Sequence, residues 1–580
     1  MLNNTNEKEL LARIQDLEKQ IKNLKDRKKF GLVWEDKPEE IVLACETQVP
    51  ILKEVKNRKL VSDNKTPTNI LIEGDNYHSL SVLNYTHANS IDVIYIDPPY
   101  NTGSTDWRYN NDYVDKEDSF RHSKWISFMD KRLRMARNLL KENGVICVTI
   151  DDYEISRLLI LMEEIFNEFN HLGTVPIRNN PAGRSTTKGI SITHEYAIFF
   201  GKTEKSRVGR LERNQKQIDR YKEEDSKGKF EWVNFRKPGS MRSESPKMFY
   251  PIFISKDKIR LPKIEWNDTK EEWILKEKPN KDEFVIYPID DDGKERRWRW
   301  GIERFENEKE ELSPRFLKNK PHAYVKGRIN DEGVLPMTWW DKKEYSSTAY
   351  GTNLLKDIFA ELQIFSYPKS LYAVMDSILV MSESKEAVVL DFFAGSGTTG
   401  HAVLELNKQD GGNRKFILCT NNENKIAEEV TYERLKRVIK GYKNKKGEKV
   451  EGLGGNLSYY KTDLVDIEKL QRISDESKIK ITHQAGEMIA IRENTLNESN
   501  KNDWWQIFEN EDKKTAIYFK EDKAKLPELV KLLEKENKPT VLYIFGWGKN
   551  EYKNEYSTKN IKVEDIPEPI IEVYKEINRI

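Results

Sequence analysis

One stretch of the sequence decides the fold: the apolar run Ile91-Asp92-Val93-Ile94-Tyr95-Ile96, which leads directly into Asp97-Pro98-Pro99-Tyr100. The run 91–96 predicts a buried strand. The two prolines end that strand and stiffen the turn, because neither has an N–H to donate to a sheet. The turn therefore brings a carboxylate, a rigid backbone carbonyl and an aromatic ring to the carboxyl end of a strand, the edge at which open α/β sheets bind ligands.

This group of side chains suits the alkylation of a planar exocyclic amine, which is a poor nucleophile because its lone pair is delocalised into the ring. Asp97 and the Pro98 carbonyl would accept the two amine hydrogens, localise the lone pair and stabilise charge that develops only in the transition state. Tyr100 would stack on the base, at roughly 1–3 kcal/mol. The alternative is a tight turn whose aspartate caps a helix.

The composition indicates a soluble protein of more than one domain, since 37% of the 580 residues are hydrophobic and 34% are charged. The chain has no long apolar run, so we predict neither a membrane span nor a signal peptide. The three cysteines, Cys45, Cys147 and Cys419, lack the spacing of a zinc site, and we expect buried thiols in a cytoplasmic protein. With a net charge of +1, any nucleic-acid interface must be a local patch.

The N-terminus carries a short heptad pattern, with apolar residues at Leu10, Ile14, Leu17, Ile21 and Leu24. We predict a helix within residues 1–30 that associates with a second copy or a partner subunit. The alternative is an amphipathic helix packed on its own domain. Residues 31–69 are predicted to be an irregular entry segment.

Strands and helices then alternate, which predicts an α/β fold with a mostly parallel sheet and helices on both faces. We predict strands at 70–72, 91–96, 145–150, 194–200, 387–390 and 415–419, and helices that include 125–141, 154–169 and 371–381. Asn143-Gly144 is predicted to cap the end of the first of these helices. Asp75 follows the first strand and either caps the next helix or holds a ligand amine. Residues 446–580 predict a small α+β domain.

The regular pattern breaks between residues 201 and 345, where basic and aromatic residues are interleaved. Guanidinium and aromatic groups together suit phosphate binding and base reading. We therefore predict a target-recognition insert, although a solvated charged face is the alternative. Its candidate DNA-binding residues are Arg207, Arg210, Arg213, Arg242, Arg297 and Arg299.

A turn rich in glycine follows the strand 387–390 and reads Asp391-Phe392-Phe393-Ala394-Gly395-Ser396-Gly397-Thr398. A strand, a Gly-x-Gly turn and a helix are typical of a nucleotide-cofactor loop, because glycine allows close backbone approach and a helix N-terminus favours a negative ligand group. The turn matches neither the six-residue dinucleotide fingerprint nor a phosphate-binding loop.

The pairing of Asp97-Pro98-Pro99-Tyr100 with this glycine turn resembles the DNA amino-methyltransferases that use S-adenosylmethionine. The order of the two motifs, with an insert between them, resembles the β class of N6-adenine methyltransferases. Residues 97–112 and Arg297-Trp298-Arg299-Trp300-Gly301 most resemble the modification subunits of type III restriction-modification systems. The resemblance covers roughly residues 70–460 and implies a circularly permuted, seven-stranded, mostly parallel sheet.

The resemblance also implies roles for individual residues. Asp97, Pro98, Pro99 and Tyr100 would act on an adenine flipped out of the duplex, and no metal is expected, because the sulfonium is already an activated donor. Asp75 would meet the cofactor's adenine amine and Asp391 its ammonium, whereas the position that often holds the ribose is Thr420. The full set of cofactor residues would be Asp75, Lys369, Ser370, Asp391, Phe393, Ala394, Gly395, Ser396, Gly397 and Thr398.

The resemblance divides the chain into a methyltransferase domain in two parts, 31–200 and 346–445, around a target-recognition domain at 201–345. Its implied partners are double-stranded DNA, a second copy of the chain that reads DNA while the first methylates, and a separate restriction subunit. Cytosine-N4 methylation is the chemical alternative, which Asp97 in place of a serine disfavours. A catalytically silent DNA-binding scaffold for a nuclease is the alternative of another class.

Overall fold

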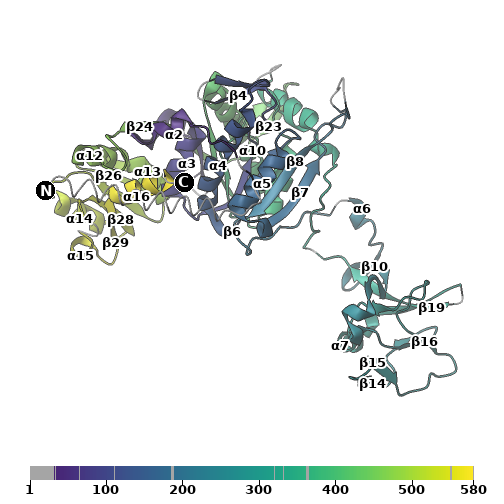
Figure 1. Cartoon of the computed structure of the whole chain (residues 1–580). Coiled ribbons are helices and arrows are strands. Elements are labelled where there is room, and N and C mark those ends of the chain that lie inside the picture. Colours follow the sequence, from purple (N-terminus) through teal and green to yellow (C-terminus); the bar gives the residue numbers. More distant parts are fainter. Residues whose placement is uncertain are drawn as a thin grey trace, which may run out of the picture. The chain divides into compact units, whose positions relative to one another are not determined.

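The structure is a computed structural model that describes residues 32–578 except 33, 64–65, 110–111, 184–188, 214, 319, 331, 361–364 and 549–551, and the side chains of 104–109 and 112–113 lie outside the description. The chain forms two compact units (Figure 1). The first comprises Met1–Arg210 and Leu335–Ile580, and the second comprises Leu211–Val334. The heptad pattern at residues 10–24 lies outside the described residues.

A nine-stranded sheet forms the centre of the first unit, two strands more than the seven that the resemblance implied. The strands from β24 to β6 pair in parallel, β8 is antiparallel to its two neighbours, and β1 is antiparallel to β24. The mostly parallel sheet is thus confirmed. The order across the sheet is β1 (Gln48–Glu54), β24 (Asn456–Asp466), β2 (Thr68–Glu73), β21 (Lys415–Thr420), β20 (Val388–Asp391), β3 (Ile91–Ile96), β6 (Leu140–Ile150), β8 (Glu195–Gly201) and β7 (His171–Ile177).

Both faces of this sheet are covered, since consecutive residues of β3 are buried whichever face they point to. Among the described residues, the helices of the first unit before the insert are α2 (Glu40–Ala44), α3 (Asn76–Thr86), α4 (Arg121–Leu139) and α5 (Ile155–Phe166). Between the insert and β24 lie α8 (Asn353–Phe359), α9 (Leu371–Met381), α10 (Thr398–Asp410) and α11 (Tyr432–Lys440). Short ribbons pair β4 (Ser104–Tyr109) with β5 (Asp112–Asp115), and β22 (Gly441–Lys443) with β23 (Lys449–Glu451).

The predicted helix end at Asn143-Gly144 is wrong. Helix α4 stops at Leu139, and Leu140 already has extended backbone angles and starts β6. Gly144 instead lies at an irregularity where β6 pairs with β3, and a Cβ atom there would come within 3.0 Å of the Ile91 carbonyl oxygen. The glycine therefore marks a close approach of two strands rather than a helix cap.

Two predicted boundaries also need correction. Residues 31–69 contain α2 and the edge strand β1, and β24, within the predicted 446–580 domain, belongs to the central sheet. The separate five-stranded sheet follows β24. It consists of β25 (Asn497–Lys501), β26 (Trp505–Glu509), β27 (Lys514–Tyr518), β28 (Thr540–Phe545) and β29 (Ile561–Ile566), with α12 (Asp475–Gln484), α13 (Gly486–Arg492), α14 (Leu526–Lys535), α15 (Lys553–Tyr556) and α16 (Glu568–Ile577).

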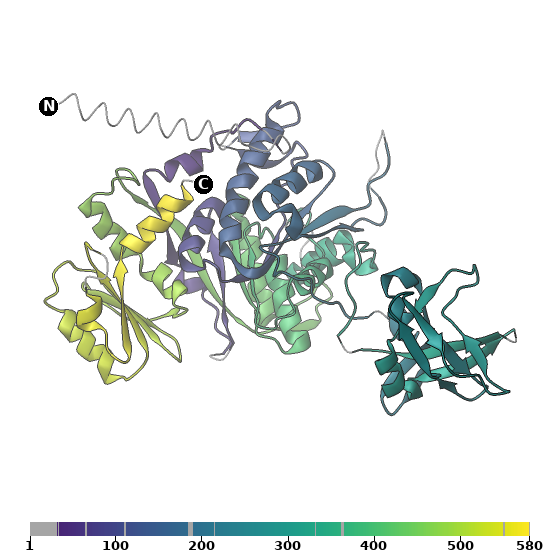
Figure 2. The ribbon, with the colours of Figure 1, turned by 60° about the horizontal axis from the view of Figure 1, so that its bottom comes forward.

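The C-terminal helix α16 ties this sheet to the N-terminal elements, which lie beside it in Figure 2. Its Ile570 and Ile571 belong to the same buried apolar cluster as Ile51 of β1 and Leu80 of α3. Tyr574 of α16 also donates a hydrogen bond to the Pro50 carbonyl at 2.5 Å. The end of the chain is therefore part of the first unit.

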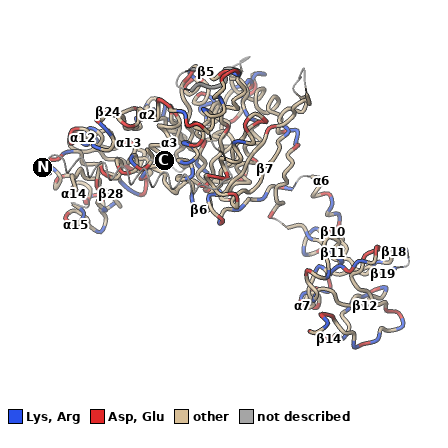
Figure 3. The backbone as a smooth tube through the Cα atoms, viewed as in Figure 1, with Lys and Arg blue, Asp and Glu red and all other residues tan. Residues whose placement is uncertain are grey.

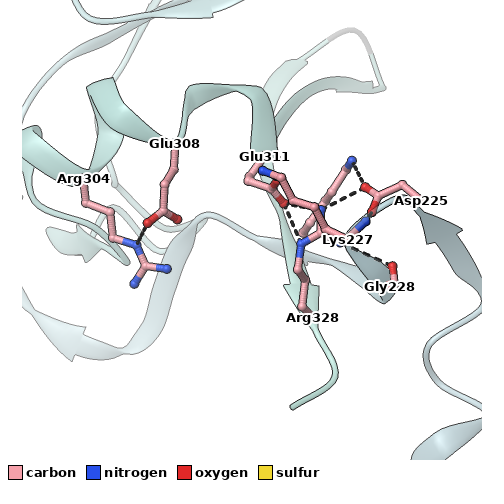
Figure 4. A network of polar contacts seen from close by, with 8 residues as sticks. Asp225, Lys227, Gly228, Arg304, Glu308, Glu311 and Arg328 are labelled. Atoms are coloured by element: carbon pink, nitrogen blue, oxygen red, sulfur yellow. Dashed lines mark hydrogen bonds and ion pairs between the residues drawn. The ribbon is translucent and has the colours of Figure 1, made fainter. Parts of the chain in front are cut away.

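The second unit is built from antiparallel strand pairs around an aromatic core that includes Phe235, Trp298, Trp300 and Phe305. On its surface Asp225 and Glu311 share Arg328, and Lys227 reaches Glu311 at 2.8 Å (Figure 4). Its elements are α6 (Gln215–Ile218), β9 (Glu223–Asp225), β10 (Gly228–Asn234), β11 (Arg236–Met241), β12 (Ile252–Ile254), β13 (Ile259–Arg260), β14 (Ile264–Asn267), β15 (Glu272–Leu275), β16 (Phe284–Ile286), β17 (Arg296–Trp298), α7 (Ile302–Asn307), β18 (Leu312–Leu317) and β19 (Lys320–Arg328).

The first and last residues of the second unit pair with each other. The Leu211 N–H donates to the Val334 carbonyl and the Val334 N–H donates to the Leu211 carbonyl, each at 2.9 Å. The chain therefore leaves the first unit and returns to it through one two-residue neck. This neck lies inside the predicted insert limits of 201 and 345.

Acidic and basic residues are interspersed along both units (Figure 3). All three cysteines are buried and unpaired, as predicted. Among the described residues, every helix is too short or too polar to cross a bilayer.

Candidate active site

The two motifs meet at one edge of the central sheet. Strands β3 and β20 are parallel neighbours, with Ile94 opposite Leu390, so Asp97 and Asp391 emerge side by side from their carboxyl ends. The chain continues from β20 to β21 on one side and from β3 to β6 on the other. Such a switch point opens a crevice at the carboxyl edge, where α/β proteins bind ligands.

The Asp97-Pro98-Pro99-Tyr100 turn is fixed by its surroundings. Thr149 Oγ1 donates to Asp97 Oδ1 at 2.6 Å, and Trp125 Nε1 donates to the Pro99 carbonyl at 2.7 Å. Within the part of the chain that the structure describes, no group donates to Asp97 Oδ2 or to the Pro98 carbonyl. These are the two acceptors that the sequence predicts for an amine.

The stretch just after the turn is anchored as well. Asn101 adopts a left-handed backbone with φ 56° and donates to the buried Glu154 at 2.5 Å. His122 bonds to the same carboxylate oxygen at 2.5 Å. The Asp97-Pro98-Pro99-Tyr100 turn and the residue that follows it are thus held by side chains from several elements.

Lys369 lies against the catalytic turn. Its Nζ is 3.0 Å from Asp97 Oδ1 and 2.6 Å from Glu195 Oε2, and it also bonds to the Tyr100 hydroxyl. Burial alone would lower the pKa of Lys369, but the charges of Asp97 and Glu195 outweigh it and raise that pKa. The sequence predicted Lys369 as a cofactor residue, and its ammonium contacts Asp97 and Tyr100 of the Asp97-Pro98-Pro99-Tyr100 turn.

Glu195 was not among the predicted site residues. It is buried at the start of β8, and its Oε2 accepts a hydrogen bond from the Tyr100 hydroxyl at 3.0 Å. Because β8 is antiparallel to β6, its amino end lies at the edge where the parallel strands have their carboxyl ends. Glu195 can be recognised as a site residue only when the direction of β8 is known, because that direction decides which end of the strand lies at this edge.

The backbone of the glycine turn has the left-handed conformation that is typical of a loop in close contact with a ligand. Gly395 has φ 48° and Gly397 has φ 75°, the left-handed region that glycine adopts readily. A Cβ atom at Gly395 would lie 3.3 Å from the Phe365 ring, and one at Gly397 would lie 3.1 Å from the Thr431 methyl group. The turn therefore has little room for a side chain at either glycine.

A buried arginine that the sequence did not reveal supports this turn. Arg434 of α11 is fully buried, and its Nη1 donates to the Ser396 carbonyl at 3.2 Å and to Thr398 Oγ1 at 2.8 Å. Thr431 donates to the Gly395 carbonyl at 2.5 Å. These bonds assign Ser396 and Thr398 to the structure of the turn. Arg434 lies in a highly charged helix, where nothing in the sequence distinguishes it from its neighbours.

Asp391 is buried beneath the glycine turn. Burial raises the pKa of Asp391 to about 7; hydrogen bonds from Thr399 at 2.5 Å and the Phe393 N–H at 2.9 Å oppose the rise, and the charge of Asp97 adds to it. A buried carboxyl group beside a second acid suits a positively charged ligand group.

Two further predicted cofactor residues are helix caps. Asp75 caps α3 by accepting from the Tyr77 N–H at 2.6 Å, and Ser370 caps α9 by accepting from the Ala373 N–H at 3.4 Å. Beside Asp75, Nε2 of the buried His78 has no partner among the described residues. A buried nitrogen without a partner fits a site that a polar ligand completes.

Phe393 and Ala394 complete the turn: the Phe393 ring lies 5.9 Å from that of Phe128, and the Ala394 N–H donates to the Cys419 carbonyl at 3.1 Å. Among the described residues, no group of three or more His, Cys, Asp or Glu side chains is arranged to hold a metal ion.

The six predicted DNA-binding arginines are divided between the units. Arg207 and Arg210 belong to the first unit and the other four to the second. Those four bond within their own unit: Arg213 to Asn330, Arg242 to Glu295 at 3.1 Å, Arg297 to the Met248 sulfur at 3.0 Å, and Arg299 to the Asn234 carbonyl at 2.7 Å. They therefore stabilise the second unit whether or not they also contact DNA.

The DNA methylase family model matches residues 91–433, which is more than half of the chain and contains both motifs. The chain therefore belongs to this family of DNA methylases. It is 32% identical over 429 residues to the type III restriction-modification enzyme EcoPI Mod subunit of Escherichia phage P1, which covers 68% of this chain and 64% of that protein.

Over 377 residues the chain is 35% identical to the type II methyltransferase M.KpnI of Klebsiella pneumoniae, covering 64% of this chain and 84% of the relative. The chain thus spans less than two thirds of the EcoPI Mod subunit but most of M.KpnI. A solved putative DNA modification methylase from Thermus thermophilus, complexed with S-adenosyl-L-methionine, is 12% identical with a TM-score of 0.28 and covers 64% of this chain and 94% of that one.

Proposed function

We propose that this chain is a site-specific DNA methyltransferase that transfers a methyl group from S-adenosylmethionine to N6 of an adenine flipped out of the duplex. One observation carries the proposal: Asp97 Oδ2 and the Pro98 carbonyl stand at the switch point with no donor among the described residues, while the groups around them are bonded. Two acceptors on one rigid turn match the two hydrogens of an exocyclic amine.

The residues fit S-adenosylmethionine, which supplies an already activated methyl group. The left-handed glycines of the turn allow close approach of its methionine part, and Asp391 would hold the ammonium. Asp75 would accept from the adenine amine while it caps α3. The neighbouring carboxylates Asp97 and Asp391 suit a ligand with two positive charges.

The chain's own groups account for the chemistry at the target. Asp97 and the Pro98 carbonyl accept the amine hydrogens. The Asp97 carboxylate would stabilise the positive charge that grows on nitrogen as the nitrogen–carbon bond forms and the cofactor's sulfur–methyl bond breaks, and the methylated nitrogen would then lose one proton through its hydrogen bond to Asp97. Tyr100 stacks on the flipped base. Because Thr149 and Trp125 already hold the turn, little reorganisation is needed when the base arrives.

We further propose that the chain is a modification subunit that works in the cytoplasm as a homodimer, beside a separate restriction subunit. The similarity to the EcoPI and StyLTI Mod subunits, at 32% and 30% identity, supports this role. The second unit would read the DNA sequence, because it is a self-contained body inserted through one neck.

The first prediction tests the reaction. In cells that express only this protein, methylation-aware sequencing should find N6-methyladenine at one recurring sequence. Asp97→Ala should remove it, because losing a charged acceptor costs about 100- to 1,000-fold in rate. The control is Asp463→Ala, a half-exposed aspartate of β24 paired with Lys53, which should methylate normally. N4-methylcytosine at the site would show that the target base is cytosine and not adenine. No methylation by the wild-type protein would favour a catalytically silent DNA-binding scaffold.

The second prediction tests the cofactor site with two left-handed glycines, Gly395 in the glycine turn and Gly411 at the far end of α10. Gly397 and Gly411 flank α10, and Gly411 has φ 68° with open space around its Cα. Gly395→Ala and Gly411→Ala carry a similar left-handed penalty, but only Gly395 faces the crowded turn. Calorimetry should show weaker S-adenosylmethionine binding for Gly395→Ala alone. Equal affinities in two folded variants would mean that the cofactor binds at another site.

The third prediction tests sequence reading. Residues 212–333 should be exchanged for the corresponding insert of a relative with another recognition sequence, with Leu211 and Val334 kept so that the neck is preserved. The chimera should methylate the donor's sequence. Methylation of the original sequence by a folded chimera would exclude the second unit as the reader.

The fourth prediction concerns assembly. Light scattering should find a dimer for the full chain and also for a chain lacking residues 1–30, because a single heptad helix of that length is a marginal interface. Conversion of the shortened chain to a monomer would make the N-terminal segment the main interface. A monomeric full chain would remove the division of labour between two copies.

A further inference from the structure

Lys369 and Glu195 lie against the catalytic motif, but the proposed reaction assigns no role to either residue. The Lys369 ammonium contacts Asp97 Oδ1 at 3.0 Å, Glu195 Oε2 at 2.6 Å and the Tyr100 hydroxyl. The side chain of Lys369 is 12% exposed and that of Glu195 is 5% exposed. Water therefore screens these charges little, and their effect on one another is strong.

A purely structural role explains this arrangement poorly. Removing two charges from water costs about as much as their attraction returns, so a buried ion pair adds little net stability. Here one cation is shared by two carboxylates, which leaves one negative charge uncompensated. Two of the three groups that Lys369 contacts, Asp97 and Tyr100, belong to the catalytic motif.

The contacts define which oxygen of Asp97 remains available. Oδ1 is occupied from two sides, by Thr149 Oγ1 at 2.6 Å and by Lys369 Nζ at 3.0 Å. Among the described residues no donor reaches Oδ2, which lies on a side chain that is 28% exposed. The carboxylate is therefore held at one oxygen and open at the other.

The same pair holds the aromatic ring. The Tyr100 hydroxyl donates to Glu195 Oε2 at 3.0 Å and accepts from Lys369, whose Nζ lies 4.7 Å from the ring centre. A tyrosine fixed at its hydroxyl has its ring plane set before the base arrives, so stacking costs less conformational entropy.

We propose that Lys369 and Glu195 are positioning residues on the substrate side of the site: together they fix which oxygen of Asp97 meets the target amine and hold the Tyr100 ring for the flipped base. The inference rests on the proposed function. It assigns Lys369 to the target base rather than to the cofactor.

The charges give this role a distinctive signature. Without Lys369, Asp97 and Glu195 would be neighbouring carboxylates in a largely buried site, and like charges raise carboxyl pKa values. A protonated Asp97 is a poorer acceptor, so activity would be low near neutral pH and would return as pH rises. Without the Glu195 charge, Asp97 would keep its cation and stay ionised, so no such shift would appear.

The test measures kcat, KM and their pH dependence with the purified full-length chain and a duplex that carries its site. Lys369→Met should lower kcat by about 100-fold at neutral pH, with recovery toward about pH 9. Glu195→Gln should lower kcat without moving the pH profile. Adding Glu195→Gln to Lys369→Met should restore part of the neutral-pH activity, because the repulsion is removed. Calorimetry should give unchanged S-adenosylmethionine affinity for all three variants, which also shows that they fold.

Lys342 offers a matched control. Its Nζ lies 2.6 Å from Asp376 Oδ2, which also accepts from the Tyr345 hydroxyl at 2.5 Å. This is the same combination of lysine, aspartate and tyrosine without the catalytic turn. Lys342→Met should therefore leave kcat and its pH profile unchanged.

Other outcomes overturn the inference. Weaker cofactor binding by Lys369→Met with normal kcat at saturation would return Lys369 to the cofactor site. Loss of activity with an unshifted pH profile in Lys369→Met and no rescue by the second substitution would make the pair merely structural. An inactive wild-type chain would instead contradict the proposed function, which the same assay reports separately.

Discussion

The structure depends on the parallel pairing of β20 with β3. This pairing joins two segments almost three hundred residues apart in the chain, and it alone brings the glycine turn beside the catalytic turn. Because both strands end at the same edge, their terminal aspartates become neighbours, and the charge of Asp97 adds to the rise that burial causes in the pKa of Asp391. The candidate site therefore carries more negative charge than its lysine, Lys369, balances.

Most of the strands and helices could be predicted from local sequence patterns. Strands such as Ile91–Ile96 are continuous apolar runs because both faces of the sheet are covered, and α9 lies where periodicity predicted it. The predictions that were wrong concern segments whose contacts are with residues remote in the sequence. The edge strand β1 is joined to the sheet only through β24, and β24 pairs in turn with β2. Gly144 was mistaken for a helix cap because its close contact is with β3.

The candidate site divides in the same way. Asp97 and Gly395 stand in motifs whose order predicts a role for each, so both could be named as candidate site residues from the sequence. Glu195, Thr149 and Arg434 could not, because each acts through a neighbour that only the fold supplies. Lys369 was predicted as a cofactor residue from its place in a motif, whereas its contacts with Asp97, Glu195 and Tyr100 depend on the direction of its side chain, which a motif does not give.

The order of the strands also constrains how this chain can fold. In the sheet, β21 and β20 lie between β2 and β3, yet they are the later segments in the sequence. While the chain is being synthesised, β2 and β3 each expose an unpaired edge until residues 388–420 have been made. Exposed apolar strand edges invite pairing with other chains, and contacts between such distant segments form slowly. Because β20 and β21 are made only after the insert, the gap between β2 and β3 at the centre of the sheet is filled late in synthesis, and β24 follows later still on the other side of β2.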